Sequence, residues 1–160
     1  MRHLGNLAAV VALALRDAGG PPLAMQLLIY PATDMAADAP SHRELAEGHM
    51  LTRDAIQWFM GNYLRGPADV ADWRASPLRA ADLSRLPPAY VVTAGFDPLR
   101  DEGRAYAEAM EQAGVAVTHE CFDGMIHGFI TMGGALAAAQ HALYRLATAL
   151  RQRFVNRARG

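Results

Sequence analysis

The feature that most constrains the fold is a strand, a helix and a strand that follow one another between residues 86 and 124. The stretch "LPPAYVVTAGFDPL" holds a short apolar run between prolines, the pattern of a strand buried on both faces. "DEGRAYAEAMEQAG" begins with acidic residues and ends at Gly114, which is typical of a capped helix. A further apolar run, "VAVTHECFDG", comes next. This order predicts two parallel strands joined by a right-handed crossover, and hence an α/β fold.

Another buried strand and a long helix lie on either side of this unit. The stretch "PPLAMQLLIYPATD" repeats the pattern of a short apolar run between prolines. The chain closes with a predicted amphipathic helix from about 135 to 154, with leucines at helical spacing. These are Leu136, Leu143, Leu146 and Leu150. We therefore expect three strands with flanking helices.

The opening stretch, "MRHLGNLAAVVALALRDAGGPP", is open to two interpretations. Arg2 and His3 followed by an apolar run suggest a secretory signal, but the run stops at Arg16-Asp17 without a small-residue cleavage site. It is also too short to span a bilayer. A helix over 6–18 that stops at glycine and proline pairs fits better, although its beginning carries no start signal.

Residues 34–87 separate the first two strands and are too many for a plain loop. Within them, "LTRDAIQWFMGNYL" predicts a helix with Thr52 as its N-cap. Its apolar face consists of Ile56, Phe59, Met60 and Tyr63. Such a stripe either packs on the body of the protein or forms a lid, in which Trp58, Phe59 and Tyr63 would line an apolar pocket.

The composition, 52% hydrophobic and 19% charged with a net charge of -1, is typical of a soluble globular protein. It offers no basic surface, so we expect neither nucleic acid nor an anionic membrane as a partner. Cys121 is the single cysteine and cannot form an internal disulfide, which favours a cytoplasmic location. The histidines outside "MIHGF" lack the paired spacing of zinc ligands, so we expect no metal.

Two polar residues stand where this fold places its chemistry. Asp97 follows a buried strand, at the carboxyl end where open parallel sheets hold ligands and reactive groups. His127 follows the next strand, in the glycine-flanked loop "FDGMIHGF". The carboxylate could bind one imidazole nitrogen and leave the other as a general base. Asp101 and Glu102, at the start of the following helix, are expected only to complement its dipole.

Three stretches, "YPATD", "SPLRAADLSRLPPAYVVTAGFDPLRDEGRAYAEAMEQAGVAV" and "FDGMIHGF", closely resemble the α/β-hydrolase-3 esterases, bacterial relatives of hormone-sensitive lipase. The resemblance runs from about Gly5 into the last helix. It implies a partial α/β-hydrolase fold, with C-terminal parallel strands, flanking helices and a helical cap at 34–87, within one domain over 1–160. It also implies a carboxylic ester hydrolase that needs no cofactor and acts on small apolar esters. Asp97 would be its triad acid and His127 its triad base.

The resemblance further implies that the nucleophile is missing from this sequence. In the family the elbow G-D-S-A-G-G precedes N-L-A-A, whereas here Arg2 stands where the serine would be. The H-G-G-G loop of the oxyanion hole is also absent. The sequence has three serines, none in a G-x-S-x-G turn, and nothing near Cys121 suggests an activated thiol. We therefore expect a truncated chain that is inactive by itself.

Two hypotheses of different class follow. The chain is either the C-terminal half of an ester hydrolase or a non-catalytic α/β module that binds a small ester or a partner. In the first case the strand at 25–30 would have an open, apolar edge, because the earlier strands of the family's sheet are absent. Open edges pair with other chains, so we expect self-association.

Overall fold

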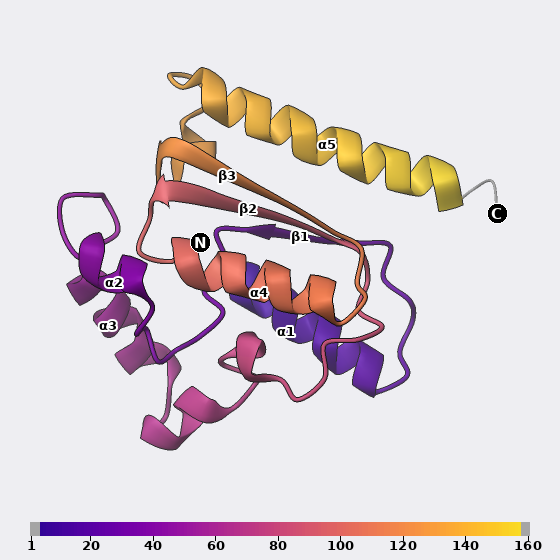
Figure 1. Cartoon of the computed structure of the whole chain (residues 1–160), viewed down its shortest axis with the longest axis horizontal. Coiled ribbons are helices and arrows are strands. Elements are labelled where there is room, and N and C mark those ends of the chain that lie inside the picture. The colour runs from indigo at the N-terminus through magenta and orange to yellow at the C-terminus, as the bar shows by residue number, and fades with distance from the viewer. Residues whose placement is uncertain (1–3, 158–160) are drawn as a thin grey trace.

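Three parallel strands form one sheet in the order β1-β2-β3 (Figure 1). The strands are β1 (Gln26–Ile29), β2 (Ala89–Phe96) and β3 (Val117–Ile126). The computed structural model describes residues 4–157. Ala89 pairs with both Gln26 and Val117, so the strands start level and their carboxyl ends meet at one edge. The predicted parallel crossover is confirmed.

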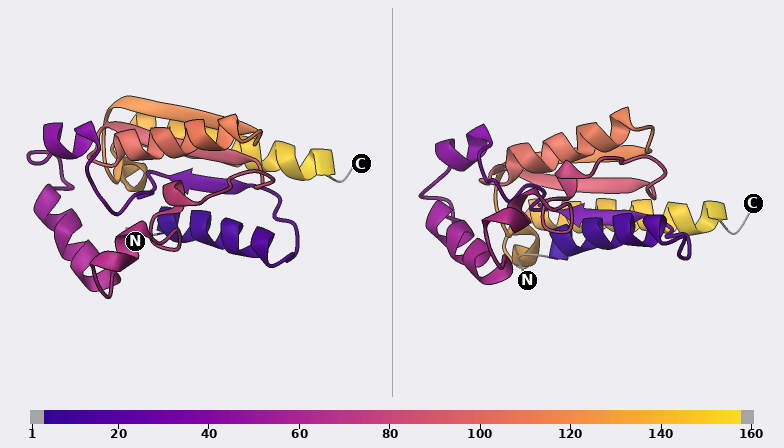
Figure 2. Two further views of the ribbon diagram at one scale, coloured as in Figure 1. Left: turned by 60° about the horizontal axis from the view of Figure 1, so that its bottom comes forward. Right: turned by 90° about the horizontal axis from the view of Figure 1, so that it is seen from below.

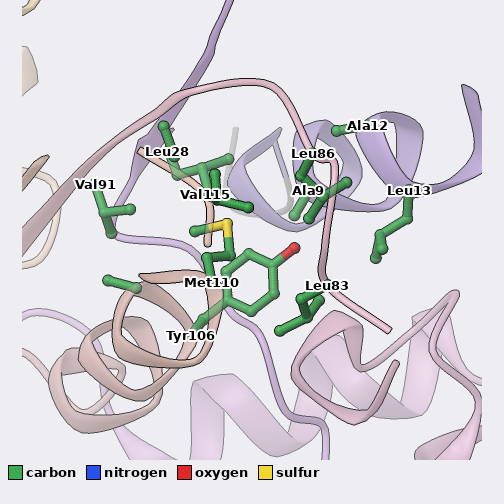
Figure 3. Close-up of a cluster of buried hydrophobic side chains, with 12 residues drawn as sticks. Ala9, Ala12, Leu13, Leu28, Leu83, Leu86, Val91, Tyr106, Met110 and Val115 are labelled. Atoms are coloured by element: carbon green, nitrogen blue, oxygen red, sulfur yellow. The ribbon is translucent and has the colours of Figure 1, made fainter. Parts of the chain in front are cut away.

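Helices cover both faces of this sheet. On one face lie α1 (Leu4–Asp17) and α4 (Arg100–Gln112), and on the other lies α5 (Ala137–Arg157) (Figures 1 and 2). Because side chains alternate along a strand, Val91 packs toward α1 and α4, and its neighbours Tyr90 and Val92 pack toward α5. Figure 3 shows the cluster of buried hydrophobic side chains on the α1 and α4 face, with Tyr106 and Met110 of α4 at its centre.

The crossover helix α4 ends as its sequence predicts. Gly114 adopts a left-handed φ of +84°, which glycine tolerates because it has no side chain. The N–H of Val115 donates to the carbonyl of Met110 at 3.0 Å, the bond of a glycine-capped helix end. This turn directs the chain back into β3.

The predicted leucine stripe of α5 is only partly correct. Leu146 is buried, but Leu143 is 46% exposed. The helix contacts the sheet mainly through alanines, and Ala139 and Ala142 are fully buried. These small side chains allow the helix to lie close to the sheet.

The opening stretch forms the predicted helix, α1, and Met1 to His3 lie outside the described residues. Residues 34–87 contain structure of their own, as expected. Their elements are α2 (Pro40–Glu44), α3 (Arg53–Tyr63) and the 3₁₀ turns η1 (Pro67–Ala71) and η2 (Pro77–Arg79). Thr52 caps α3, because its hydroxyl accepts a hydrogen bond from the N–H of Ala55 at 3.2 Å. Both α2 and α3 lie beyond the carboxyl ends of the strands (Figure 1).

Among residues 4–157, no helix is both long and apolar enough to cross a membrane.

Candidate active site

Asp97 lies directly after β2 and is fully buried. The N–H of Leu99 donates to its Oδ1 at 2.9 Å, and the N–H of Arg100 donates to its carbonyl oxygen at 2.9 Å. These bonds fold the chain into the tight turn that begins α4. One carboxylate oxygen is thereby fixed, and the other, Oδ2, faces the neighbouring strand.

His127 lies directly after β3, and only 5% of its surface is exposed. Its Nδ1 lies 2.7 Å from Oδ2 of Asp97. An ionised carboxylate can only accept hydrogen bonds, so this pair fits an Nδ1–H donor and leaves Nε2 as an acceptor. The structure thus brings together the two residues that the sequence singled out.

A bulge in β3 makes this meeting possible. Ala94 pairs with Phe122, but Phe96 pairs with Ile126, so β3 contributes two additional residues between these pairs. In an unbroken register Phe96 would lie opposite Gly124, and Asp97 would fall short of His127. The bulge therefore sets the register of the site.

A glycine turn follows His127 directly. Gly128 has φ +84°, and its carbonyl oxygen accepts hydrogen bonds from the N–H and the hydroxyl of Thr131, at 3.0 and 2.8 Å. Phe129, at the start of the 3₁₀ turn η3 (Phe129–Met132), is fully buried against α5. The backbone of His127 is therefore held between the paired end of β3 and the turn at Gly128.

A small apolar cavity of about 30 Å³ adjoins His127. Its lining includes Phe59 and Met60 of α3, together with Ile56, which packs on the body of the protein against Leu99. The two interpretations of the α3 face are thus compatible, since one stripe both packs and lines a pocket. Tyr63 and Trp58 are not in this lining, and Trp58 is 64% exposed.

Asp101 and Glu102 do more than complement a helix dipole, and that expectation is wrong. Both are buried, with 8% and 3% of their surface exposed. Oε1 of Glu102 accepts from the N–H of Thr33 at 2.7 Å, and Oε2 lies 2.5 Å from Nε2 of His42. Oδ2 of Asp101 accepts from the N–H of Ser41 at 2.9 Å. These acids fasten residues 33–42 to the turn that holds Asp97.

The two acids respond differently to burial. Burial raises the pKa of Glu102, although hydrogen bonding to His42 opposes the change. Burial also acts to raise the pKa of Asp101, but hydrogen bonds from Arg100 and Ser41 outweigh it, so this pKa lies below its usual value.

Two serines and the cysteine are candidate nucleophiles, and none has an activating environment. The hydroxyls of Ser41 and Ser76, both fully buried, donate to the carbonyls of Pro98 and Val70 at 2.6 and 2.7 Å. Burial raises the pKa of the Cys121 thiol, as its position in a strand suggested, so the protonated form is favoured. None of the three side chains has the environment of an activated nucleophile.

A family model described as alpha/beta hydrolase fold matches residues 5–131. The chain belongs to the α/β hydrolase family. This confirms the resemblance drawn from "DPLRDEG" and "MIHGF", and with it the fold class.

Curated relatives of this α/β hydrolase chain act on esters. This chain is 45% identical over 147 residues to the carboxylic ester hydrolase LipN of Mycobacterium tuberculosis, and the match covers 87% of this chain and 39% of LipN. It is 42% identical over 152 residues to the carboxylesterase NlhH of the same organism, covering 92% of this chain and 47% of NlhH. The chain therefore spans about half the length, or less, of these relatives.

The chain also matches solved structures of α/β hydrolases. An α/β hydrolase enzyme from the metagenome of Lake Arreo, Spain, matches with a TM-score of 0.89 at 44% identity, over 94% of this chain and 47% of that one.

Proposed function

We propose that this chain carries the acid and base of a carboxylic ester hydrolase, with Asp97 as the triad acid and His127 as the triad base. The observation that carries the proposal is the 2.7 Å distance between the buried Nδ1 of His127 and Oδ2 of Asp97. The ester-hydrolysing relatives support the same chemistry.

The proposed reaction has two halves. A serine hydroxyl supplied by polypeptide outside this sequence attacks the ester carbonyl carbon, and its proton passes to Nε2 of His127. Asp97 stabilises the imidazolium, which returns the proton to the leaving alcohol as the carbon–oxygen bond breaks. Water then attacks the acyl-serine with His127 again as base, and the carboxylic acid and the free serine are released.

In this proposal the chain by itself does not hydrolyse esters. Ser41 and Ser76 are buried with their hydroxyls donated to carbonyls, and neither lies in a nucleophile elbow. The sequence also lacks the H-G-G-G loop of the oxyanion hole. Loss of one oxyanion donor costs roughly a hundred- to a thousandfold in rate, so loss of the whole hole together with the nucleophile is prohibitive.

We propose a small apolar ester as the substrate, because the side chains that surround the cavity beside His127 are apolar. The cavity itself, at about 30 Å³, is no larger than a water molecule. We assign residues 34–87 to a cap within a single domain, because α3 of this segment lines the cavity through Phe59 and Met60. A cytoplasmic location stays an inference from the single cysteine.

We also propose that a second copy of the chain pairs with β1. The N–H groups of Gln26 and Tyr30 donate to the carbonyls of Pro88 and Val92, on the β2 side. The backbone N–H groups of Leu27 and Ile29 therefore face the open side. A groove of about 330 Å³ runs along this side, lined by β1, α1 and η3. Leu4, Leu7 and Val11 of α1 are 61%, 43% and 50% exposed nearby. An apolar surface beside an open strand edge favours association.

The experiment joins this chain to the part of NlhH that lies outside the match and measures hydrolysis of a short p-nitrophenyl ester. We expect an active chimera, a loss of activity in His127→Ala, and a roughly ten-thousandfold lower kcat in Asp97→Asn, the loss known for serine proteases. The unfused chain should show no hydrolysis. A folded chimera that is inactive, or indifferent to His127, would favour the alternative of a non-catalytic binding module.

A further inference from the structure

Tyr30, the residue after β1, has a backbone conformation that tyrosine rarely adopts. Its φ is +34°, in the left-handed region, where a side chain crowds its own backbone. The next residue is Pro31, and a residue before proline is further restricted toward extended conformations. Such strain persists only where the surroundings impose it, and it concentrates at functional sites.

The residues around Tyr30 impose its left-handed backbone conformation. The N–H of Tyr30 donates to the carbonyl of Val92 at 2.6 Å, which keeps the residue attached to the sheet. Pro31 is fully buried against the start of α1, where a Cβ atom on Gly5 would lie 2.9 Å from the Cα of Pro31. Beyond it, the N–H of Thr33 is bound to Glu102. The backbone is therefore fixed on both sides of the strained residue.

This conformation brings the Tyr30 ring against the candidate base. The centroids of the Tyr30 and His127 rings lie 4.5 Å apart, with the planes inclined at 51°. The Tyr30 ring also lies beside that of Phe129, with the ring centroids 6.2 Å apart and the ring planes inclined at 60°. His127 is thus bounded by Asp97 at Nδ1 and by an aromatic ring beside it, and this packing contributes to its 5% exposure.

The tyrosine hydroxyl adds no charge to this site. Burial, followed by the negative charge of Asp97, raises the pKa of Tyr30, so the phenol stays neutral. The aromatic ring, and not the hydroxyl, is then the part of Tyr30 that acts on the imidazole. An aromatic ring this close to a histidine also attracts the positively charged imidazolium.

We infer that Tyr30 is a positioning residue for the base, whose ring holds the imidazole of His127 on Asp97 and keeps water from the Nδ1–Oδ2 hydrogen bond. The inference rests on the proposed function for its catalytic meaning, but the contact itself exists in this chain. The left-handed backbone at Tyr30 is the structural cost of placing the ring there.

The test follows the proton on Nδ1 of His127 by NMR of the ¹⁵N-labelled chain, through its downfield signal and its rate of exchange with water. Tyr30→Phe keeps the ring and should retain the signal. Tyr30→Leu should lose it through faster exchange. Tyr30→Gly also removes the ring but accepts a positive φ without strain, so it should stay folded and still lose the signal. Tyr144→Leu replaces a tyrosine that is 69% exposed on α5 and should leave the signal unchanged.

The possible outcomes distinguish the positioning role of Tyr30 from the pairing of His127 with Asp97. If Tyr30→Gly is folded by its amide spectrum and retains a slowly exchanging Nδ1 proton, the positioning role is wrong. If Tyr30→Phe loses the signal, the hydroxyl acts and the assignment to the ring is wrong. Asp97→Asn tests the acid–base pair independently, since an unchanged signal in that variant would contradict the pair itself.

Discussion

A Cβ atom on Gly95 would lie 2.0 Å from the carbonyl oxygen of Asp123, closer than any real contact of this kind. The two backbones come this close at the β-bulge, where the register of β3 shifts by two residues relative to β2. Asp97 follows directly after β2 and His127 directly after the bulged strand β3, so the contact between Asp97 and His127 depends on a glycine at position 95.

Gly95→Ala should therefore separate the pair as well as destabilise the fold. Strand backbone must shift to admit the methyl group, and we expect a loss of at least about 1–3 kcal/mol in the free energy of unfolding. Gly124→Ala is the matched control, because a Cβ atom there meets nothing within 4 Å. It should change the stability by less than about 0.5 kcal/mol. Urea denaturation of both variants measures this, and equal effects would contradict the role given to the bulge.

Ser41→Ala tests how the 33–42 segment is attached to the turn after Asp97. The Ser41 hydroxyl donates to the carbonyl of Pro98 at 2.6 Å, and the N–H of Asp101 donates to the hydroxyl at 3.3 Å. Both groups would be left buried without this partner, so we expect a loss of about 1–3 kcal/mol. Ser84→Ala, at a half-buried serine, should cost less in the same denaturation experiment. A neutral Ser41→Ala variant would show that this bond contributes nothing.

The pH dependence of stability should include a contribution from Asp101. Its pKa in the folded chain lies below the usual value, so its stabilisation is present above the unfolded pKa of about 3.9 and is lost as the pH falls through the folded value. Asp101→Asn should therefore be less stable than the parent chain at pH 7, and the difference should shrink in acid. Urea midpoints measured from neutral to acid pH check this. A difference that stays constant with pH would rule the contribution out.

Self-association should depend on the α1 side of the sheet. Replacing both Leu4 and Leu7 with lysine places charges beside the open edge of β1 and should shift the chain toward monomer. Leu143→Lys introduces a charge at a leucine that is 46% exposed on α5, across the sheet from α1, and should leave the assembly unchanged. Size-exclusion chromatography with light scattering reports the mass of each. A monodisperse monomer of the unmodified chain would contradict the proposed pairing.

The sequence by itself determined the parts of this protein that depend on local pattern. Short apolar runs between prolines identify β1 and β2, and the acidic start and Gly114 of α4 fix the crossover between β2 and β3. Parallel strands end at a common edge, so the sequence alone predicts that Asp97 and His127 lie close together.

Only the tertiary structure decided which polar groups are buried and how the site is supported. Asp101 and Glu102 look like ordinary residues of a helix start, yet their partners Ser41 and His42 lie 60 positions earlier in the chain. Tyr30 reads as the end of an apolar strand, and its contact with His127 spans nearly a hundred residues. Periodicity and propensity report on a few neighbouring residues, whereas burial, strained backbone and side-chain pairing arise where distant segments meet. That is why the candidate acid and base could be located from the sequence, but the side chains that pack around them could not.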